Sequence, residues 1–180
     1  SRFPDVGNGN KQSLSDFANE VIEAAAKSFG INVKWDGFDR AKKRIGCCHY
    51  SGFAGQVTFA KITLSKYFAK VMPSNELKDT VLHEIAHACS SIKDGETGHG
   101  HTWKAWCRKL GASPSRCKRV DNKVKKYMKK FHKWELVCPS CGNAIGYFRK
   151  PKHGPKGRAC SHCCNGTWKK EYVLELKKLK

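Results

Sequence analysis

Two things are scarce in this chain of 180 residues, and each absence narrows its function. No stretch approaches the roughly 20 consecutive apolar residues of a membrane-spanning helix, and the N-terminus carries no secretory signal pattern. Acidic residues are few in one half: residues 102–180 contain 22 Lys and Arg against 4 Asp and Glu, whereas residues 1–101 contain 13 against 11. We therefore expect no membrane insertion, and a basic surface for a polyanion, most often nucleic acid.

The overall net charge of +20 is concentrated in that second half. Its alternatives to a nucleic-acid surface are a solvated basic tail and contact with an anionic membrane surface. The length fits one domain with a small appendage, and we find no internal repeat. We expect a monomer.

The segment His83-Glu84-Ile85-Ala86-His87 contains two ligands and the base of a catalytic zinc site. Residues four apart share one face of a helix, so both imidazoles can reach one metal ion. A catalytic zinc takes three protein ligands and keeps a fourth position for water, and a Glu beside the first His is the general base of zincins. The pattern predicts hydrolysis, of a peptide bond above all. The alternative is two surface histidines on an amphipathic helix.

The third zinc ligand decides the subclass. A metzincin requires Gly at position 90 and His at position 93, but the chain has Ser90 and Lys93, which excludes that class. A gluzincin would use a downstream Glu, and Glu96 is available. We favour His99, because the glycines on either side free its backbone. His101 is a competing ligand, with a substrate contact as its other interpretation.

Two C-x-x-C pairs in the basic half are separated by 18 residues, which is the spacing of a four-cysteine structural zinc site. Cys164 and His162 remain alternatives for the fourth ligand. Ten cysteines grouped in this way favour a zinc ribbon over a secreted disulfide scaffold, and therefore a reducing, intracellular compartment. The four predicted ligands are Cys138, Cys141, Cys160 and Cys163.

The segments HEIAHA and HGHTW, which begin at His83 and His99, resemble the SprT-like zinc metalloproteases, whose pattern is HExxHA, a loop, then HGxxF or HGxxW. Residues 56–65 are similar to the strand that precedes the metal helix in that family. The resemblance implies His83, His87 and His99 as zinc ligands and Glu84 as the catalytic acid/base. It also implies a protease that cuts proteins covalently trapped on DNA and is activated by nucleic acid.

The expected fold is α+β: a zincin-like metalloprotease domain, with helices packed on a small mixed or antiparallel sheet, followed by a β-rich zinc ribbon. Hydrophobic periodicity predicts helices over 13–29, with Ser13 or Ser15 as N-cap, and through the metal motif, with Ser74 or Asn75 as N-cap. We predict that the strand 57–64 is an exposed edge that binds the substrate main chain, or else an ordinary sheet strand. Further elements are strands near 33–35 and 44–50, a short helix at 65–71 and a helix from Trp103 to Leu110. The predicted domains are a loosely ordered segment 1–12, the protease domain 13–133 and the ribbon 134–180.

Aromatic and basic side chains alternate along the ribbon, an arrangement in which rings stack on unpaired bases while cations follow the phosphates. We predict single-stranded DNA binding without sequence specificity. The lysine-rich stretch 119–133 is either a basic connector that faces phosphate or a solvated helix face. The predicted DNA contacts are Trp134, Tyr147, Phe148, Arg149, Lys150, Arg158, Trp168 and Lys169.

The sequence thus predicts a DNA-dependent protease with two zinc ions, one catalytic and one structural, located in the nucleus or on chromatin if the source is eukaryotic. A non-catalytic zinc-dependent DNA-binding module is the first alternative. A zinc peptidase whose basic half binds RNA or an acidic protein is the second. The residue that stabilises the oxyanion is not identified; His101 and a nearby Tyr are the candidates.

Overall fold

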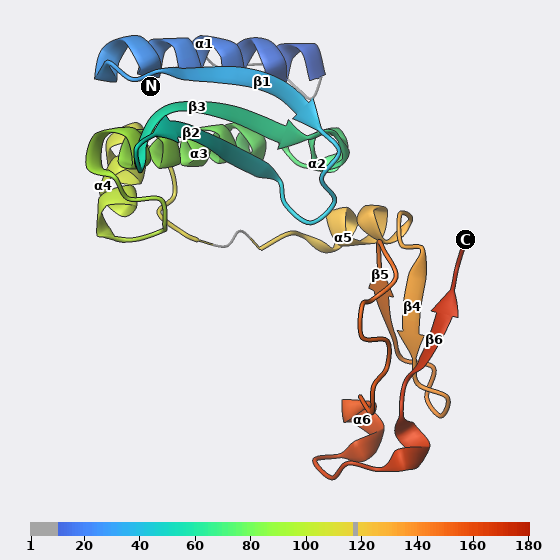
Figure 1. The fold of residues 1–180 in the computed structure, drawn as a ribbon. Coiled ribbons are helices and arrows are strands. Elements are labelled where there is room, and N and C mark those ends of the chain that lie inside the picture. Colours follow the sequence, from blue (N-terminus) through green and yellow to red (C-terminus); the bar gives the residue numbers. More distant parts are fainter. Residues whose placement is uncertain (1–10, 117–118) are drawn as a thin grey trace. The chain divides into compact units, whose positions relative to one another are not determined.

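The computed structural model describes residues 11–116 and 119–180 and divides the chain into two compact units, between Val124 and Lys125 (Figure 1). This division lies before the boundary that we placed at residue 133. Of the segment 1–12, residues 1–10 lie outside the description, while Lys11 and Gln12 already belong to the first helix. No helix in the described ranges is both long enough and apolar enough to cross a membrane.

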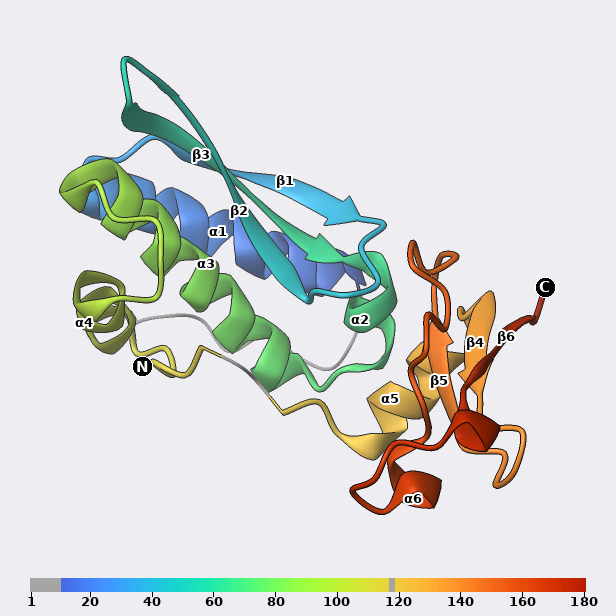
Figure 2. The ribbon, with the colours of Figure 1, turned by 60° about the horizontal axis from the view of Figure 1, so that its bottom comes forward.

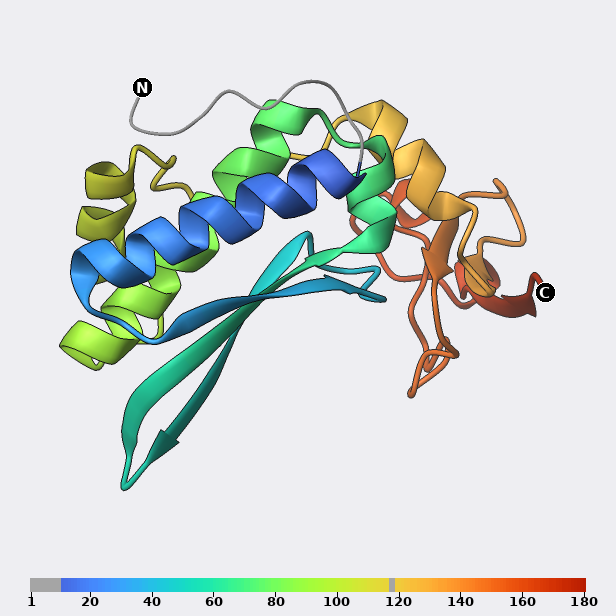
Figure 3. The same ribbon diagram turned by 90° about the horizontal axis from the view of Figure 1, so that it is seen from above.

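The first unit has a three-stranded sheet in the order β1-β3-β2, with β1 parallel and β2 antiparallel to the central strand β3. Figures 2 and 3 show the long helices α1 and α3 on the same face of this sheet. The chain leaves this unit through α5, which ends in the second unit. The elements are α1 (Lys11–Phe29), β1 (Val33–Asp39), β2 (Gly46–Phe53), β3 (Gln56–Ser65), α2 (Lys66–Val71), α3 (Ser74–Asp94), α4 (His101–Leu110) and α5 (Asn122–Lys129).

The core of this unit lies between the sheet and the two long helices. On β3, Ala60, Ile62 and Leu64 alternate with outward-facing residues and are fully buried, as expected for one face of a pleated strand. Val81 and Ile85 of α3 are also fully buried, at the four-residue spacing that places both on one helix face. Their burial fixes the rotation of α3, and therefore which of its residues face the sheet.

Two of the predicted helix starts are wrong. Helix α3 begins at Ser74 with Pro73 as its N-cap, and no side chain caps it, so neither Ser74 nor Asn75 has that role. Helix α1 begins at Lys11, and Ser13 and Ser15 therefore lie inside it. The fixed backbone angle of proline suits a helix entrance, which makes a side-chain cap dispensable at α3.

The prediction that residues 57–64 form the exposed edge is also wrong. These residues belong to β3, which has a hydrogen-bonded neighbour on both sides, whereas β2 lies at an edge of the sheet. Strand β2 passes close over α3 at Gly46, where an added Cβ would lie 2.9 Å from Thr80 Cγ2 and 3.2 Å from Glu84 Cγ. Glycine is required at this crossing because any side chain would push the strand off the helix.

The second unit has a separate antiparallel sheet in the order β5-β4-β6. Its small core consists of Leu136, Leu174 and two cysteines, Cys138 and Cys160. Together with the helix-on-sheet first unit, this small β-rich unit confirms the predicted α+β class. The elements are β4 (Trp134–Val137), β5 (Ala144–Tyr147), α6 (Ser161–Cys164), the 3₁₀ helix η1 (Lys170–Tyr172) and β6 (Glu175–Lys178).

Candidate functional site

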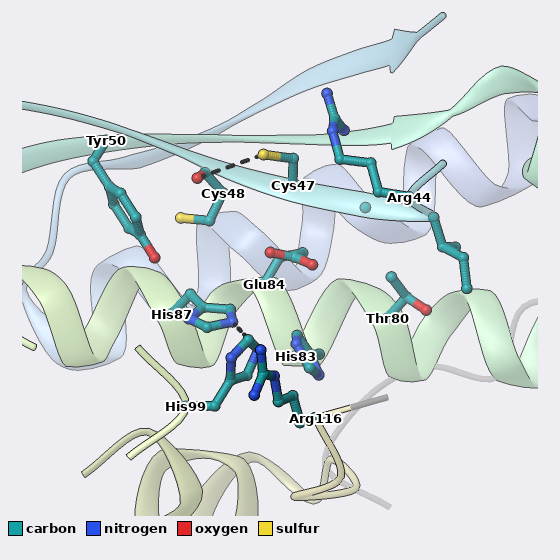
Figure 4. A pocket seen from close by; sticks show the side chains of 12 residues that line it. Arg44, Cys47, Cys48, Tyr50, Thr80, His83, Glu84, His87, His99 and Arg116 are labelled. Carbon is teal, nitrogen blue, oxygen red and sulfur yellow. Dashed lines mark hydrogen bonds between the residues drawn. The ribbon is translucent and has the colours of Figure 1, made fainter. Parts of the chain in front are cut away.

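Three histidine side chains converge on one point at the first unit. His83 and His87 lie one turn apart on α3, and His99 comes from the loop between α3 and α4 (Figure 4). One ring nitrogen from each of the three lies within 4.8 Å of the others, and Nε2 of His87 is 3.1 Å from Nε2 of His99. The structure therefore brings together the three residues that we predicted as ligands of a catalytic metal.

The distances and protonation of this cluster fit zinc. Zinc–nitrogen bonds of about 2.0–2.1 Å in a tetrahedron place two ligand nitrogens roughly 3.3 Å apart, close to the separation in the structure. Burial, followed by the neighbouring His83 and His99, lowers the pKa of His87 to about 3, and burial and then Arg116 lower the pKa of His99. Both rings are therefore neutral near pH 7, and a neutral imidazole has the lone pair that a metal requires.

The loop that carries His99 is built differently from our prediction. The residue in left-handed conformation is Gly95, which ends α3 with φ of 69°, whereas Gly98 and Gly100 do not have positive φ. At Gly100 an added Cβ would collide with the carboxylate of Glu96, and at Gly98 it would meet nothing within 4 Å. Glu96 packs against the backbone here and is not part of the histidine cluster.

Trp103 is the residue that sequence reasoning missed in this centre. We placed it only in a helix behind the metal helix, but its fully buried indole contacts all three imidazoles, with ring-centroid distances of 4.7 Å to His83, 5.2 Å to His87 and 4.6 Å to His99. Its position four residues after His99 in the HGxxW segment was the available signal. Trp103 forms the floor that holds the three rings in place.

Glu84 lies in a cavity of about 360 Å³ between β2 and α3. Its side chain is 7% exposed and shares the cavity with the three histidines, which is where a general base must be in order to reach a metal-bound water. Strand β2 supplies the opposite wall (Figure 4). The cavity is lined by Arg44, Ile45, Gly46, Cys47, Cys48, Tyr50, Thr80, His83, Glu84, His87, His99 and Arg116.

His101, our candidate substrate contact, is the first residue of α4, is exposed and does not line this cavity. Two lining residues that we had not singled out, Tyr50 and Arg116, bring polar groups close to the histidines. Tyr50 comes from β2, which follows a poorly patterned sequence, and Arg116 lies beyond α4. Neither could be placed at the metal without the fold.

The four predicted cysteines of the second unit also converge. The sulfur atoms of Cys138 and Cys163 are 3.8 Å apart, those of Cys141 and Cys160 are 3.6 Å apart, and all four lie within 4.8 Å of one another. Zinc–sulfur bonds of about 2.3 Å in a tetrahedron require sulfurs about 3.8 Å apart, so the cage has the dimensions of a zinc site. Cys164 and His162 are outside the cluster, which favours Cys163 as the fourth ligand.

The backbone helps to prepare this cage for a metal. The N–H groups of Cys141 and Ser140 donate to the sulfur of Cys138 and, despite its burial, lower the pKa of that thiol to about 7. Thiolate is the form that binds zinc, so a lowered pKa favours metal binding near neutral pH. The donor set, spacing and backbone donors all fit a structural zinc ion.

The predicted DNA contacts lie at different depths in the second unit. Trp168 is 59% exposed, and its Nε1 donates to the carbonyl oxygen of Gly157 at 2.7 Å. Trp134 and Tyr147 are half-buried, and the hydroxyl of Tyr147 accepts a hydrogen bond from Arg158 at 3.0 Å. Trp168 thus offers the most open ring. Half-buried Phe148 and exposed Arg149, Lys150 and Lys169 complete the set.

Comparison with known proteins places these centres in context. The SprT-like family model matches residues 11–126, which is more than half of the chain. The DNA-dependent metalloprotease SPRTN of Xenopus tropicalis is 29% identical over 126 residues, which cover 66% of this chain and 27% of that protein. The DNA-dependent metalloprotease dvc-1 of Caenorhabditis elegans is 28% identical over 152 residues, with 78% and 39% covered.

The Germ cell nuclear acidic-1 protein of Caenorhabditis elegans is 26% identical over 160 residues, which cover 83% of this chain and 27% of that protein. The chain therefore spans well under half the length of each of these relatives. The family match runs from α1 to α5 and includes the whole histidine cluster with Glu84. The chain belongs to the SprT-like family.

Proposed function

We propose that this chain is a DNA-dependent zinc metalloprotease that hydrolyses peptide bonds in proteins bound or covalently crosslinked to DNA. The observation that carries the proposal is the cluster of three imidazoles with Glu84 beside it in an open cavity. Two relatives are named DNA-dependent metalloproteases, which supports the same reaction class. The non-catalytic alternative does not account for a base retained in this cavity.

His83, His87 and His99 would hold the catalytic zinc. When bound, zinc polarises a carbonyl and lowers the pKa of a coordinated water towards neutrality. Glu84 would accept a proton from that water and deliver it to the leaving amine, the role of the Glu in an HExxH motif. Its partial enclosure between β2 and α3 limits bulk water, which strengthens the electrostatic interactions of its carboxylate.

The edge strand β2 supplies a means of binding many different substrates. Its free edge can pair with an extended peptide through main-chain hydrogen bonds, which do not depend on side-chain identity. The same strand forms one wall of the cavity from Gly46 to Tyr50, so a paired peptide would run past the histidines. Such binding suits a protease whose substrates share attachment to DNA rather than a sequence.

The second unit is proposed to bind DNA through its structural zinc ribbon. Residues 125–180 contain 15 Lys and Arg against 3 Glu, and the open ring of Trp168 lies next to Lys169 in the chain. Cations neutralise phosphates and exposed aromatic rings stack on unpaired bases, without readout of base edges. We therefore propose single-stranded DNA, without sequence specificity, as the activating ligand, and a nuclear or chromatin location.

The test is cleavage of one labelled protein presented in four forms: free, mixed with single-stranded DNA, crosslinked to single-stranded DNA and crosslinked to duplex DNA. We expect cleavage to be fastest when the protein is crosslinked to single-stranded DNA, and to be inhibited by free single-stranded DNA more than by RNA of equal length. Equal cleavage of all four forms would contradict DNA dependence. Stronger inhibition by RNA would favour the peptidase that binds RNA.

A further inference from the structure

Tyr50 is placed where a group that acts on the substrate carbonyl would be needed. Residues two apart on a strand point to the same face, so Tyr50 shares the helix-facing side of β2 with Gly46 and Cys48. Gly46 lies directly over Glu84, and Tyr50 lines the same cavity as Glu84 and His87. Figure 4 shows its ring directed from β2 towards α3, with the hydroxyl on the side of His87.

The hydroxyl of Tyr50 has only a weak partner. It hydrogen-bonds the thiol of Cys48, and sulfur is a poor acceptor compared with an oxygen anion. Exchanging this partner for a charged oxygen therefore costs little and gains a charge-assisted hydrogen bond. The side chain as a whole is 36% exposed, so a substrate that enters the cavity can reach it without rearrangement of the core.

The surroundings of Tyr50 keep it a hydrogen-bond donor. Burial, followed by the nearby Cys48 and Glu84, raises the pKa of its phenol above the ordinary value of 10. Neutral phenol is the donating form, and it persists throughout the pH range in which Glu84 could act as a base.

We propose that the Tyr50 hydroxyl donates a hydrogen bond to the oxyanion that forms when water adds to the scissile carbonyl. This inference rests on the proposed function and adds a catalytic residue to it. As the carbon–oxygen bond to water forms, the carbonyl π electrons move to the carbonyl oxygen and Glu84 takes the proton of the water. Tyr50 keeps its own proton throughout. When the carbonyl re-forms, the carbon–nitrogen bond breaks and Glu84 returns the proton to the leaving amine.

Other polar groups at the cavity are less well placed for this task. The Arg44 guanidinium is held by the Asp39 carboxylate at 2.7 Å. Thr80 lies beneath Gly46, where the strand crosses α3. Arg116 is the remaining competitor; its charge acts on His99, and it comes from the segment after α4 rather than from the strand proposed to align the substrate. Tyr50 alone lies on that strand and directs its hydroxyl to the histidine side.

The test compares Tyr50→Phe with wild type and with the control Tyr67→Phe, whose tyrosine is on α2 and does not line the cavity. One readout is the affinity for a phosphinic peptide, a tetrahedral mimic of the hydrated carbonyl, and the other is the affinity of the same variants in a Glu84→Gln background for the uncleaved peptide. In Tyr50→Phe we expect phosphinic affinity to fall about 10- to 100-fold and kcat to fall about 100-fold or more. Peptide affinity, KM and zinc content should stay unchanged.

The outcomes separate this inference from the function on which it rests. Equal phosphinic affinity in wild type and Tyr50→Phe would overturn the role of Tyr50, while crosslink cleavage by both would leave the proposed function standing. A loss confined to Arg116→Gln would assign the oxyanion to Arg116 and overturn the inference in the same way. A zinc-loaded wild-type chain that neither binds the phosphinic peptide nor cleaves a crosslinked protein would contradict both proposals.

Discussion

The indole of Trp103 stacks on the imidazole of His87, with ring centroids 5.2 Å apart and planes inclined by only 26°. Since Trp103 also contacts the other two histidines, one buried side chain from α4 sets the orientation of the whole cluster. The zinc site proposed here therefore depends on the packing of α4 against α3 as well as on the HExxH motif.

Trp103→Phe should weaken zinc binding at the histidine site, because the smaller ring leaves the imidazoles less constrained. We expect a loss of about 10- to 100-fold in zinc affinity, as for other residues that orient metal ligands. Competition with a chelator of known affinity measures it. Trp106→Phe on the same helix is the control, since Trp106 contacts Phe29 and Asp94 rather than the histidines. Equal affinities in the two variants would contradict the floor role of Trp103.

Neighbouring cysteines in the second unit should respond differently to the same change. Cys163→Ser removes a predicted ligand from the four-sulfur cage, whereas Cys164→Ser alters a buried thiol outside it. We expect metal analysis to give two zinc ions per chain in wild type and in Cys164→Ser, and one in Cys163→Ser. Two zinc ions in Cys163→Ser, or one in Cys164→Ser, would reassign the fourth ligand.

Trp168→Ala should weaken single-stranded DNA binding through loss of stacking, by about 1–3 kcal/mol, which is roughly 5- to 150-fold in Kd. Removing the charge with Lys169→Ala should instead reduce the salt dependence, lowering the slope of log K against log salt by about 0.7. Fluorescence anisotropy at several salt concentrations separates the two effects. A Trp168→Ala variant that binds as tightly as wild type would show that this ring does not stack on bases.

Asp39 should make stability depend on pH. Burial tends to raise its pKa, but hydrogen bonds from the Ala41 N–H, the Thr63 hydroxyl and Arg44 outweigh this and lower the pKa below 3.8. A lowered folded-state pKa means that the stabilisation is complete above about pH 4 and is lost as the pH falls through the folded-state value.

Asp39→Asn should accordingly lower the free energy of unfolding by about 1–2 kcal/mol at pH 7, and the difference from wild type should shrink below about pH 4. Urea unfolding at a series of pH values measures it, with Asp36→Asn on the same strand as the control. A difference that is constant from pH 7 to pH 3 would exclude the charge of Asp39 as its source.

The metal ligands were predictable from sequence because their chemistry is local. His83 and His87 are related by one helical turn, and two C-x-x-C pairs each bring two sulfurs to one knuckle, so spacing alone indicates a shared metal. The αL glycine that ends α4, Gly111, also followed from its position after the apolar pattern.

Features that depend on the order of strands and on packing were not predictable. The alternating pattern of residues 57–64 indicates a strand but not whether it is central, and the structure gives the edge to β2. Gly46 is needed only because β2 crosses α3 at Glu84, and Tyr50 reaches the cavity only through that crossing. Contacts between segments distant in sequence leave no periodic signal in either segment.

The central claim is that Glu84 and a zinc ion at the three histidines cleave protein attached to DNA. The most direct measurement is the cleavage rate of a protein crosslinked to single-stranded DNA by wild type, by Glu84→Gln and by the control Glu20→Gln on α1, with zinc content determined for each. We predict that Glu84→Gln keeps its zinc and loses at least about 1,000-fold in rate, that Glu20→Gln cleaves like wild type, and that a chelator abolishes all cleavage. Cleavage by Glu84→Gln at the wild-type rate would contradict the account.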